Sequence, residues 1–451
     1  MSPRFFPLAV LALLPLCASA APQVHEYRLD NGLRLLVQPD HRAPVVVSQV
    51  WYKVGSSYEH DGITGASHVL EHMMFKGTEK LAPGEFSRRI AELGGRENAF
   101  TAKDYTAYFQ TLERSRLETA FELEAERMRH LQFDPAEFAK ELKVVQEERR
   151  LRTDDNPQSL AYERFNAAAF LTSPQRNPII GWPDDLANLA LEDVTAWYRR
   201  WYAPNNATVV VVGDVAPDAV HALAQKHFGP LQPESIAPPK PRSELPQDGQ
   251  RRLTLRARAE LPYLLLGYKV PTLRGAEDPA EAYALEVLAG VLDGGASARL
   301  ASELVRGEQI AASAGAGYSL YGRLPEDLFL LDGTPATGQD LAALEAALRA
   351  QVAAVQQAPV SQQELDRIKA QVVASKVYER DSVFYQAMQI GILETVGLGW
   401  QRLDEYQAAI RAVTPEQVQA VARKYLVDTR LTVAELEPLP AAGAEENRHA
   451  Q

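Results

Sequence analysis

The feature of this sequence that most constrains its fold is a proline-rich stretch, QPESIAPPKPRSELPQDGQ at residues 232–250, which separates two well-patterned regions. The stretch has no apolar periodicity, so it predicts an interdomain linker rather than a helix or a strand. A chain of 451 residues is long enough for each region to bury its own core. We therefore expect an N-terminal half at 24–231, a C-terminal half at 251–436 and a flexible tail at 437–451.

The two halves end with the same pattern of a helix, a turn and a strand. The first closes with LEDVTAWYRRWYAPNNATVVVVGD and the second with TPEQVQAVARKYLVDTRLTVAEL. Four pairs of positions match at the same offset between the halves: Glu192 with Glu416, Val194 with Val418, Trp201 with Tyr425, and Thr208 with Thr432. Two copies at this spacing favour a gene duplication over a solenoid, which requires shorter and more numerous repeats. Convergence on a common helix–turn–strand pattern is the alternative.

Within each half, strand-like runs alternate with long amphipathic helices. The predicted strands include residues 45–54, 208–212 and 263–270, and the predicted helices include 117–131, 137–151, 342–357 and 362–378. Such a mixture is typical of an α+β fold in which helices pack on one face of each sheet.

Residues 1–20, MSPRFFPLAVLALLPLCASA, have the pattern of a secretory signal peptide. Arg4 precedes an apolar run, and small residues lead to a cleavage site after Ala20. The alternative of a membrane anchor is weakened because the run is short and contains prolines. Lipidation of Cys17 is disfavoured because Leu16 stands where a small residue is usual. We expect an exported, periplasmic protein without a stable membrane span.

Composition excludes several classes of function. The chain has 47 basic and 59 acidic residues, whereas a nucleic-acid binder requires a basic face. Its single cysteine, Cys17, lies in the predicted signal peptide, so the mature chain has no disulfide, no thiolate ligand and no thiol nucleophile.

Residues 68–72 read His-Val-Leu-Glu-His, within GASHVLEHMMFKGT. On a helix, His68 and His72 lie one turn apart on one face, where their imidazoles can bind one zinc ion. Glu71 shares this stripe and can act on an activated water rather than on the metal. The order His-x-x-Glu-His inverts the commoner zinc-peptidase motif. The alternative is a pair of surface histidines, but the apolar residues that follow favour metal binding.

A zinc hydrolase also requires a third protein ligand. Because the expected mature chain has no cysteine and the other histidines are scattered, a carboxylate is expected. The predicted helix EFAKELKVVQEERRLR offers Glu141, Glu147 and Glu148. Glu141 and Glu148 share a face, whereas Glu147 points about 100° away from Glu148. By composition alone this run is typical of a solvated helix face, so the residues themselves leave the third ligand open.

The HVLEH motif and the later VVQEERR resemble the pitrilysin family of zinc peptidases, peptidase family M16, as do GGRENAFTAKDYTAYF and YAPNNATVVVVGD. The resemblance covers nearly all of residues 24–436. It implies two homologous halves with the fold of LuxS and mitochondrial processing peptidase, one zinc ion per chain, and endopeptidase activity on peptides or unfolded polypeptides. The implied ligands are His68, His72 and Glu148, with Glu71 as the general base.

The same resemblance implies roles for further residues. Glu141 would support the catalytic site by orienting a ligand, because such carboxylates tune metal affinity. Asn98 and Ala99 would lie on the strand edge that pairs with an extended substrate. In the C-terminal half, Arg306 would bind substrate, but Ser313 stands where the family usually has a tyrosine.

The C-terminal half carries no zinc motif, because the segment that corresponds to HVLEH reads AYALEVLAG. Relatives of this length often work as dimers, so we expect a homodimer, or a heterodimer with a related M16-type subunit that supplies the missing tyrosine. Two other function classes remain open. One is a non-catalytic or partner-dependent zinc-binding subunit, and the other is a regulatory zinc module with a closed ligand set.

Overall fold

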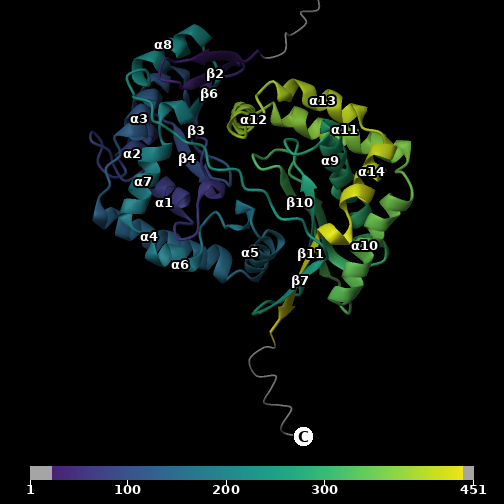
Figure 1. The fold of residues 1–451 in the computed structure, drawn as a ribbon. Helices are drawn as coiled ribbons and strands as arrows, with labels where there is room; N and C mark the ends of the chain where they lie inside the picture. The colour runs from purple at the N-terminus through teal and green to yellow at the C-terminus, as the bar shows by residue number, and fades with distance from the viewer. Residues whose placement is uncertain (1–22, 440–451) are drawn as a thin grey trace, which may run out of the picture.

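The computed structural model describes residues 23–439, so the predicted signal peptide at 1–20 and residues 440–451 of the predicted tail lie outside the described residues. The described chain forms two lobes that lie side by side, purple to teal for the N-terminal half and green to yellow for the C-terminal half (Figure 1). Each lobe is built on one β-sheet with helices against it. This two-domain arrangement confirms the predicted α+β class.

Within the described residues, the N-terminal half has a six-stranded sheet in the order β1-β2-β6-β3-β5-β4. Its strands are β1 (His25–Arg28), β2 (Arg34–Pro39), β3 (Val45–Tyr52), β4 (Arg96–Thr101), β5 (Thr106–Glu113) and β6 (Ala207–Gly213). Its helices are α1 (Ala66–Met73), α2 (Glu85–Glu92), α3 (Leu117–Arg129), α4 (Pro135–Arg149), α5 (Pro157–Ala169), α6 (Pro183–Asn188), α7 (Leu191–Trp201) and α8 (Pro217–His227). Neighbouring strands are antiparallel except β2 and β6.

The described C-terminal half has a five-stranded sheet in the order β7-β11-β8-β10-β9. Its strands are β7 (Arg251–Ala257), β8 (Tyr263–Pro271), β9 (Ala311–Gly317), β10 (Glu326–Pro335) and β11 (Leu431–Pro438). Its helices are α9 (Pro279–Asp293), α10 (Leu341–Gln357), α11 (Gln362–Glu379), α12 (Val383–Thr395), α13 (Arg402–Ala412) and α14 (Pro415–Tyr425). The strand order repeats that of the other half without β1, and β7 and β11 form the one parallel pair.

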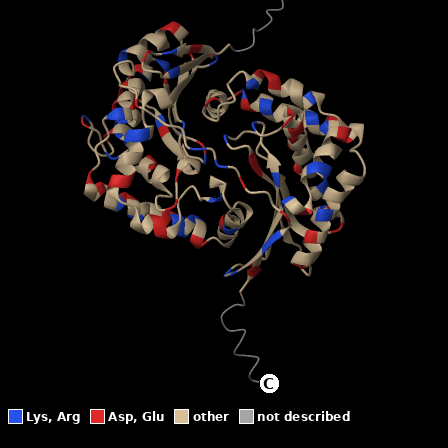
Figure 2. Ribbon diagram, viewed as in Figure 1, with Lys and Arg blue, Asp and Glu red and all other residues tan. Residues whose placement is uncertain are grey.

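Local sequence explains these elements. β6 reads ATVVVVG and is buried along its whole length, as expected for a β-branched central strand. α4 begins where the Asp134 side chain accepts from two backbone N–H groups and Pro135 follows, the usual start of a helix. In the described chain, no helix combines the length and the apolar character that crossing a membrane requires. Acidic and basic residues are interspersed along the helices of both lobes (Figure 2).

Each sheet is covered on its second face by a helix from the other half. α12 packs on β3 and β6 of the N-terminal sheet, and α5 packs on β7, β8 and β11 of the C-terminal sheet. Both contacts are close. A Cβ on Gly391 of α12 would lie 2.0 Å from the Trp51 ring, and a Cβ on Gly267 of β8 would lie 2.4 Å from the Phe165 ring. The prediction of helices on one face therefore describes each half's own helices, and the exchanged helices complete both cores.

Residues 232–250 contain no helix or strand, but they are fixed against both halves. The Glu234 carboxylate pairs with Arg129 of α3. The Glu244 carboxylate accepts from the backbone of residues 171–173 and from Lys269 of β8. At the other end of the C-terminal half, β11 extends to Pro438, into the segment predicted as a tail.

Candidate metal centre

The HVLEH motif forms most of the short helix α1, as the sequence predicts. The rings of His68 and His72 lie side by side, with centroids 4.9 Å apart. Gly65 at the helix N-terminus has no side chain to cap it. Instead, the two carboxylate oxygens of buried Glu59 accept hydrogen bonds from the N–H groups of Gly65 (2.8 Å) and Ser67 (2.7 Å). Glu59 thereby fixes the start of the helix that carries both histidines.

α4 brings its carboxylates against this face of α1. The Glu148 oxygens lie 3.9 Å from Nε2 of His68 and 3.5 Å from Nε2 of His72. One ligand atom from each of these three residues lies within 4.8 Å of the other two, the one such group among residues 23–439. Two imidazoles and one carboxylate fit a catalytic zinc site, which keeps a fourth position open. Glu147 points away and is 64% exposed, as its place on the helix predicts.

Glu141 orients the second histidine. Its Oε2 accepts from Nδ1 of His72 at 3.1 Å, and its Oε1 pairs with the Lys76 ammonium at 2.7 Å. With its proton on Nδ1, the His72 ring presents the lone pair of Nε2 towards Glu148. Lys76 was not predicted from the sequence, although it lies in the quoted segment GASHVLEHMMFKGT, just after α1 ends at Met73.

Burial sets the charge state of the first histidine. Burial, with smaller effects from His72 and Arg152, lowers the pKa of His68 to about 3. A neutral imidazole has a free lone pair, which is the form that binds a metal. Among residues 23–439 the Nδ1 atom of His68 finds no hydrogen-bond partner and is buried, in contrast to Nδ1 of His72.

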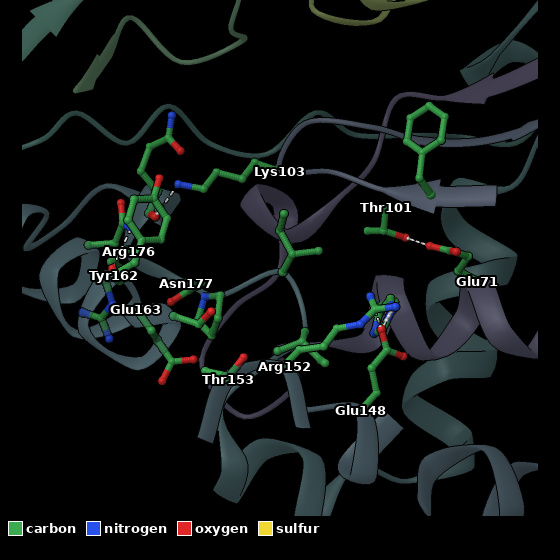
Figure 3. A pocket seen from close by; sticks show the side chains of 18 of the residues that line it. Glu71, Thr101, Lys103, Glu148, Arg152, Thr153, Tyr162, Glu163, Arg176 and Asn177 are labelled. Carbon is green, nitrogen blue, oxygen red and sulfur yellow. Dashed lines mark hydrogen bonds and ion pairs between the residues drawn. The ribbon is translucent and has the colours of Figure 1, made fainter. Parts of the chain in front are cut away.

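Glu71 projects from α1 towards the strand β4. The Thr101 hydroxyl donates to Glu71 Oε2 at 2.5 Å, a contact drawn in Figure 3. Burial raises the pKa of Glu71, which the Thr101 hydrogen bond opposes. A carboxylate with a raised pKa beside a metal site is suited to accept and return a proton. Thr101 was also missed from the sequence, although it follows Asn98 within the quoted segment GGRENAFTAKDYTAYF.

A cavity of about 880 Å³ is lined by His68, Glu71, His72, Thr101 and Glu148. Figure 3 shows Glu148 and Glu71 on one side of it and Tyr162 and Arg176 on the other. Its walls come from α1, β4, the end of α4 with the π-helical turn Arg150–Asp154, α5, and the loop at residues 175–180. The C-terminal half contributes Tyr263 of β8. Arg152 of the π-helical turn pairs with Glu148 Oε1 at 2.5 Å.

The predicted substrate-binding residues divide into two groups. Asn98 and Ala99 line the cavity and lie on β4, which within residues 23–439 pairs with β5 alone and forms the sheet edge. Arg306 is not among the cavity's lining residues, because it lies in the helical turn Leu300–Gly307 and its guanidinium donates to the Ala296 carbonyl. Ser313 lies on β9, the edge strand of the C-terminal sheet. A substrate contact of Arg306 stays a prediction.

Comparisons with known proteins agree with this geometry. The model of the family described as Insulinase (Peptidase family M16) matches residues 34–182, and that of the Peptidase M16 inactive domain matches residues 188–372. The zinc protease PqqE of Helicobacter pylori is 33% identical over 429 residues, which are 93% of this chain and 94% of that protein. The uncharacterized zinc protease YmxG of Bacillus subtilis is 28% identical over 407 residues, 90% of this chain and 96% of that protein.

Solved structures give the same assignment. A protease from Helicobacter pylori superposes with a TM-score of 0.88 at 33% identity, covering 93% of this chain and 100% of that one. The first half of the periplasmic protease PqqL from Escherichia coli, at 20% identity and a TM-score of 0.76, shares the fold over 93% of each chain. The family matches, the relatives named as zinc proteases and the shared two-domain fold converge, and the chain belongs to peptidase family M16.

Proposed function

We propose that the protein is a zinc-dependent endopeptidase that hydrolyses peptides or unfolded polypeptides in an exported, periplasmic compartment. The observation that carries the proposal is the convergence of His68, His72 and Glu148 beside Glu71, at the wall of a cavity with a free strand edge. The relatives named as zinc proteases support the metal and the reaction class.

His68, His72 and Glu148 would hold one zinc ion, which supplies a Lewis acid that activates water and polarises a carbonyl. Glu71 accepts the proton of the attacking water and delivers it to the amine of the leaving peptide. The Thr101 hydroxyl fixes one oxygen of Glu71. By accepting from Nδ1, Glu141 would keep the His72 ring in the tautomer whose Nε2 lone pair is free to bind a metal.

The edge of β4 suits an extended peptide. Asn98 and Ala99 line the cavity on a strand with a free edge, so a substrate can add as a further strand through backbone hydrogen bonds. Recognition through the backbone tolerates varied side chains, which fits a peptidase of broad specificity.

The central test replaces Glu71 by Gln. This change removes the proton acceptor but keeps the shape, so we expect the variant to bind one zinc per chain and to lose cleavage by about 10²–10⁴-fold. The matched control is Glu147→Gln, the same change on the solvent-facing side of α4. Assays combine metal analysis with cleavage of mixed unstructured peptides, with and without a chelator. Wild-type turnover by Glu71→Gln would refute the assignment.

A partner-dependent zinc-binding subunit is the second candidate, and Ser313 favours it, because the resemblance implies a tyrosine at that position. We propose a homodimer, or a heterodimer with a related M16-type subunit that supplies the tyrosine. Two measurements on the purified chain, its cleavage activity and its molar mass in solution, distinguish an active homodimer from a chain that requires a related subunit. Zinc binding without turnover until a related subunit is added would establish partner dependence.

A further inference from the structure

Two hairpin loops, one from each half, meet beside the candidate site. The first, residues 102–105, joins β4 to β5, and the second, residues 318–325, joins β9 to β10. Since β4 and β9 are the edge strands of the two sheets, these loops occupy equivalent places in the two halves. The half without the metal motif thus reaches the loop that follows the proposed substrate-pairing strand.

Arg323 makes the central contacts between these loops. Its backbone N–H donates to Asp104 Oδ2 at 2.8 Å, and its guanidinium lies 3.4 Å from Asp104 Oδ1. The guanidinium also donates to the Ser57 hydroxyl at 2.9 Å and covers the Tyr58 ring at 4.3 Å from its centroid. The Ser57 hydroxyl in turn donates to Asp104 at 2.7 Å. One arginine therefore joins two separate segments of the N-terminal half.

Both of these segments lead directly to the site. The two segments are hydrogen-bonded to each other, since the N–H groups of Ser56 and Ser57 donate to the carbonyls of residues 102 and 103. One segment continues from Tyr58 into Glu59, the carboxylate that caps α1. The other is preceded by Thr101, which donates to Glu71.

The contacts between Arg323 and Asp104 are shielded from water, and the loop that carries Arg323 is anchored to the C-terminal half. The side chains of Arg323 and Asp104 are only 20% and 8% exposed, so their attraction is little screened. The loop that presents Arg323 is anchored to its own half, because the N–H groups of Thr272 and Leu273 donate to the carbonyls of residues 325 and 320. Asp104 is held by this shielded ion pair and by hydrogen bonds from the Arg323 backbone and the Ser57 hydroxyl, and together these contacts fix its position rather than adding a loose surface attraction.

We propose that Arg323 is a positioning residue for peptide hydrolysis, through which the metal-free half holds loop 102–105, and with it the substrate edge of β4, in its working geometry. The inference rests on the proposed peptidase function. It assigns to the C-terminal half a task at the active site that requires no metal ligand of its own.

The test compares Arg323→Ala with Arg34→Ala. Arg34 of β2 also forms an ion pair between the halves, with Glu394 of α12, but near the opposite edge of the sheet. With a fluorescence-quenched peptide of mixed unstructured sequence, we expect Arg323→Ala to lose about 10–100-fold in kcat/KM, mainly through a higher KM, because small misplacements of a binding site have such effects. One zinc per chain is retained. Arg34→Ala keeps the wild-type KM.

Amide hydrogen exchange of residues 98–104 provides a readout independent of turnover. Arg323→Ala should accelerate exchange there, Arg34→Ala should not, and Arg323→Lys should restore part of the protection because it keeps a charge beside Asp104. Asp104→Asn, which keeps the fold's shape, should reproduce the effect if Arg323→Ala fails to fold. Wild-type exchange and KM in Arg323→Ala, or equal changes in Arg34→Ala, would overturn the inference. A wild-type chain that is inactive both alone and with a related subunit would refute the proposed function instead, while exchange still decides the role of Arg323.

Discussion

Glu244 offers a quantitative test of how the segment between the halves is held. Its side chain is 3% exposed, and its oxygens accept from the N–H groups of Leu171, Thr172 and Ser173, each at 2.9 Å. It also pairs with the Lys269 ammonium at 2.9 Å, on a side chain only 4% exposed. Replacing Glu244 by Gln keeps the shape but removes the charge, so Lys269 is left buried without a counter-charge.

The magnitude follows from the pKa of this carboxyl group. Burial alone would raise the pKa of Glu244, but the backbone N–H groups and Lys269 outweigh it and lower the pKa from 4.5 to about 2. A carboxyl group whose pKa is lower in the folded than in the unfolded state stabilises the folded state at pH values above its unfolded-state pKa. This stabilisation is lost as the pH falls from about 4.5 towards 2. At 1.36 kcal/mol per pKa unit the contribution is about 3 kcal/mol. Breaking a buried ion pair costs a similar amount, about 3–5 kcal/mol.

Urea denaturation of wild type and Glu244→Gln at several pH values checks this reasoning. We expect the variant to lose about 3 kcal/mol at pH 7, and the difference to shrink as the pH falls below about 4.5. Glu234→Gln is the matched control in the same segment. Glu234 is 39% exposed in its pair with Arg129, so its loss should be at most about 1 kcal/mol. Equal losses from the two variants at pH 7, or a Glu244 effect that ignores pH, would refute the reasoning.

Three further predictions follow from single contacts. Glu141→Gln should weaken zinc binding by about 10–100-fold in chelator competition, because it disturbs the carboxylate that orients His72; unchanged affinity would contradict this role. Thr101→Ala should lower kcat with little change in zinc content, and Thr101→Ser, which keeps the hydroxyl donor to Glu71, should restore it; equal loss in both would show that the hydroxyl is not responsible. Gly391→Ala should destabilise the fold by about 1–3 kcal/mol, measured by thermal unfolding, because its Cβ would overlap Trp51; a wild-type Tm would count against this packing.

Local pattern was enough to predict most elements and the pairing of two histidines on one helical face, whereas the choice of Glu148 as third ligand came from the family resemblance. The helix predicted at 137–151 is observed as α4, Pro135–Arg149, and the strand predicted at 45–54 is β3, Val45–Tyr52. The spacing of HVLEH placed His68 and His72 on one helical face, and helical geometry separated Glu148 from Glu147. These properties depend on residues within two turns of each other, which a sequence displays directly.

The remaining features depend on contacts between residues distant in sequence. Glu59 caps α1 through a bend in the chain, and Arg323 reaches Asp104 from the other half. Neither has a local signal, because an isolated Glu or Arg in a loop resembles any solvated residue. Likewise, the composition of residues 232–250 predicted a plain linker and gave no sign that Glu244 is buried against both halves.

The exchange of α5 and α12 explains why a half without a metal motif is needed. The second face of the N-terminal sheet, which is turned toward the other half, carries Trp51, fully buried under α12, and the second face of the C-terminal sheet is covered by α5 with fully buried Phe165. Removing either half would expose an extended apolar face, which soluble monomers rarely tolerate. α5 also forms a wall of the cavity, and Tyr263 of β8 lines the same cavity, so the C-terminal sheet both supports a wall of the site and contributes a side chain to it. The two halves therefore form one structural unit, joined by the packing of α5 and α12 as well as by the contacts of Arg323.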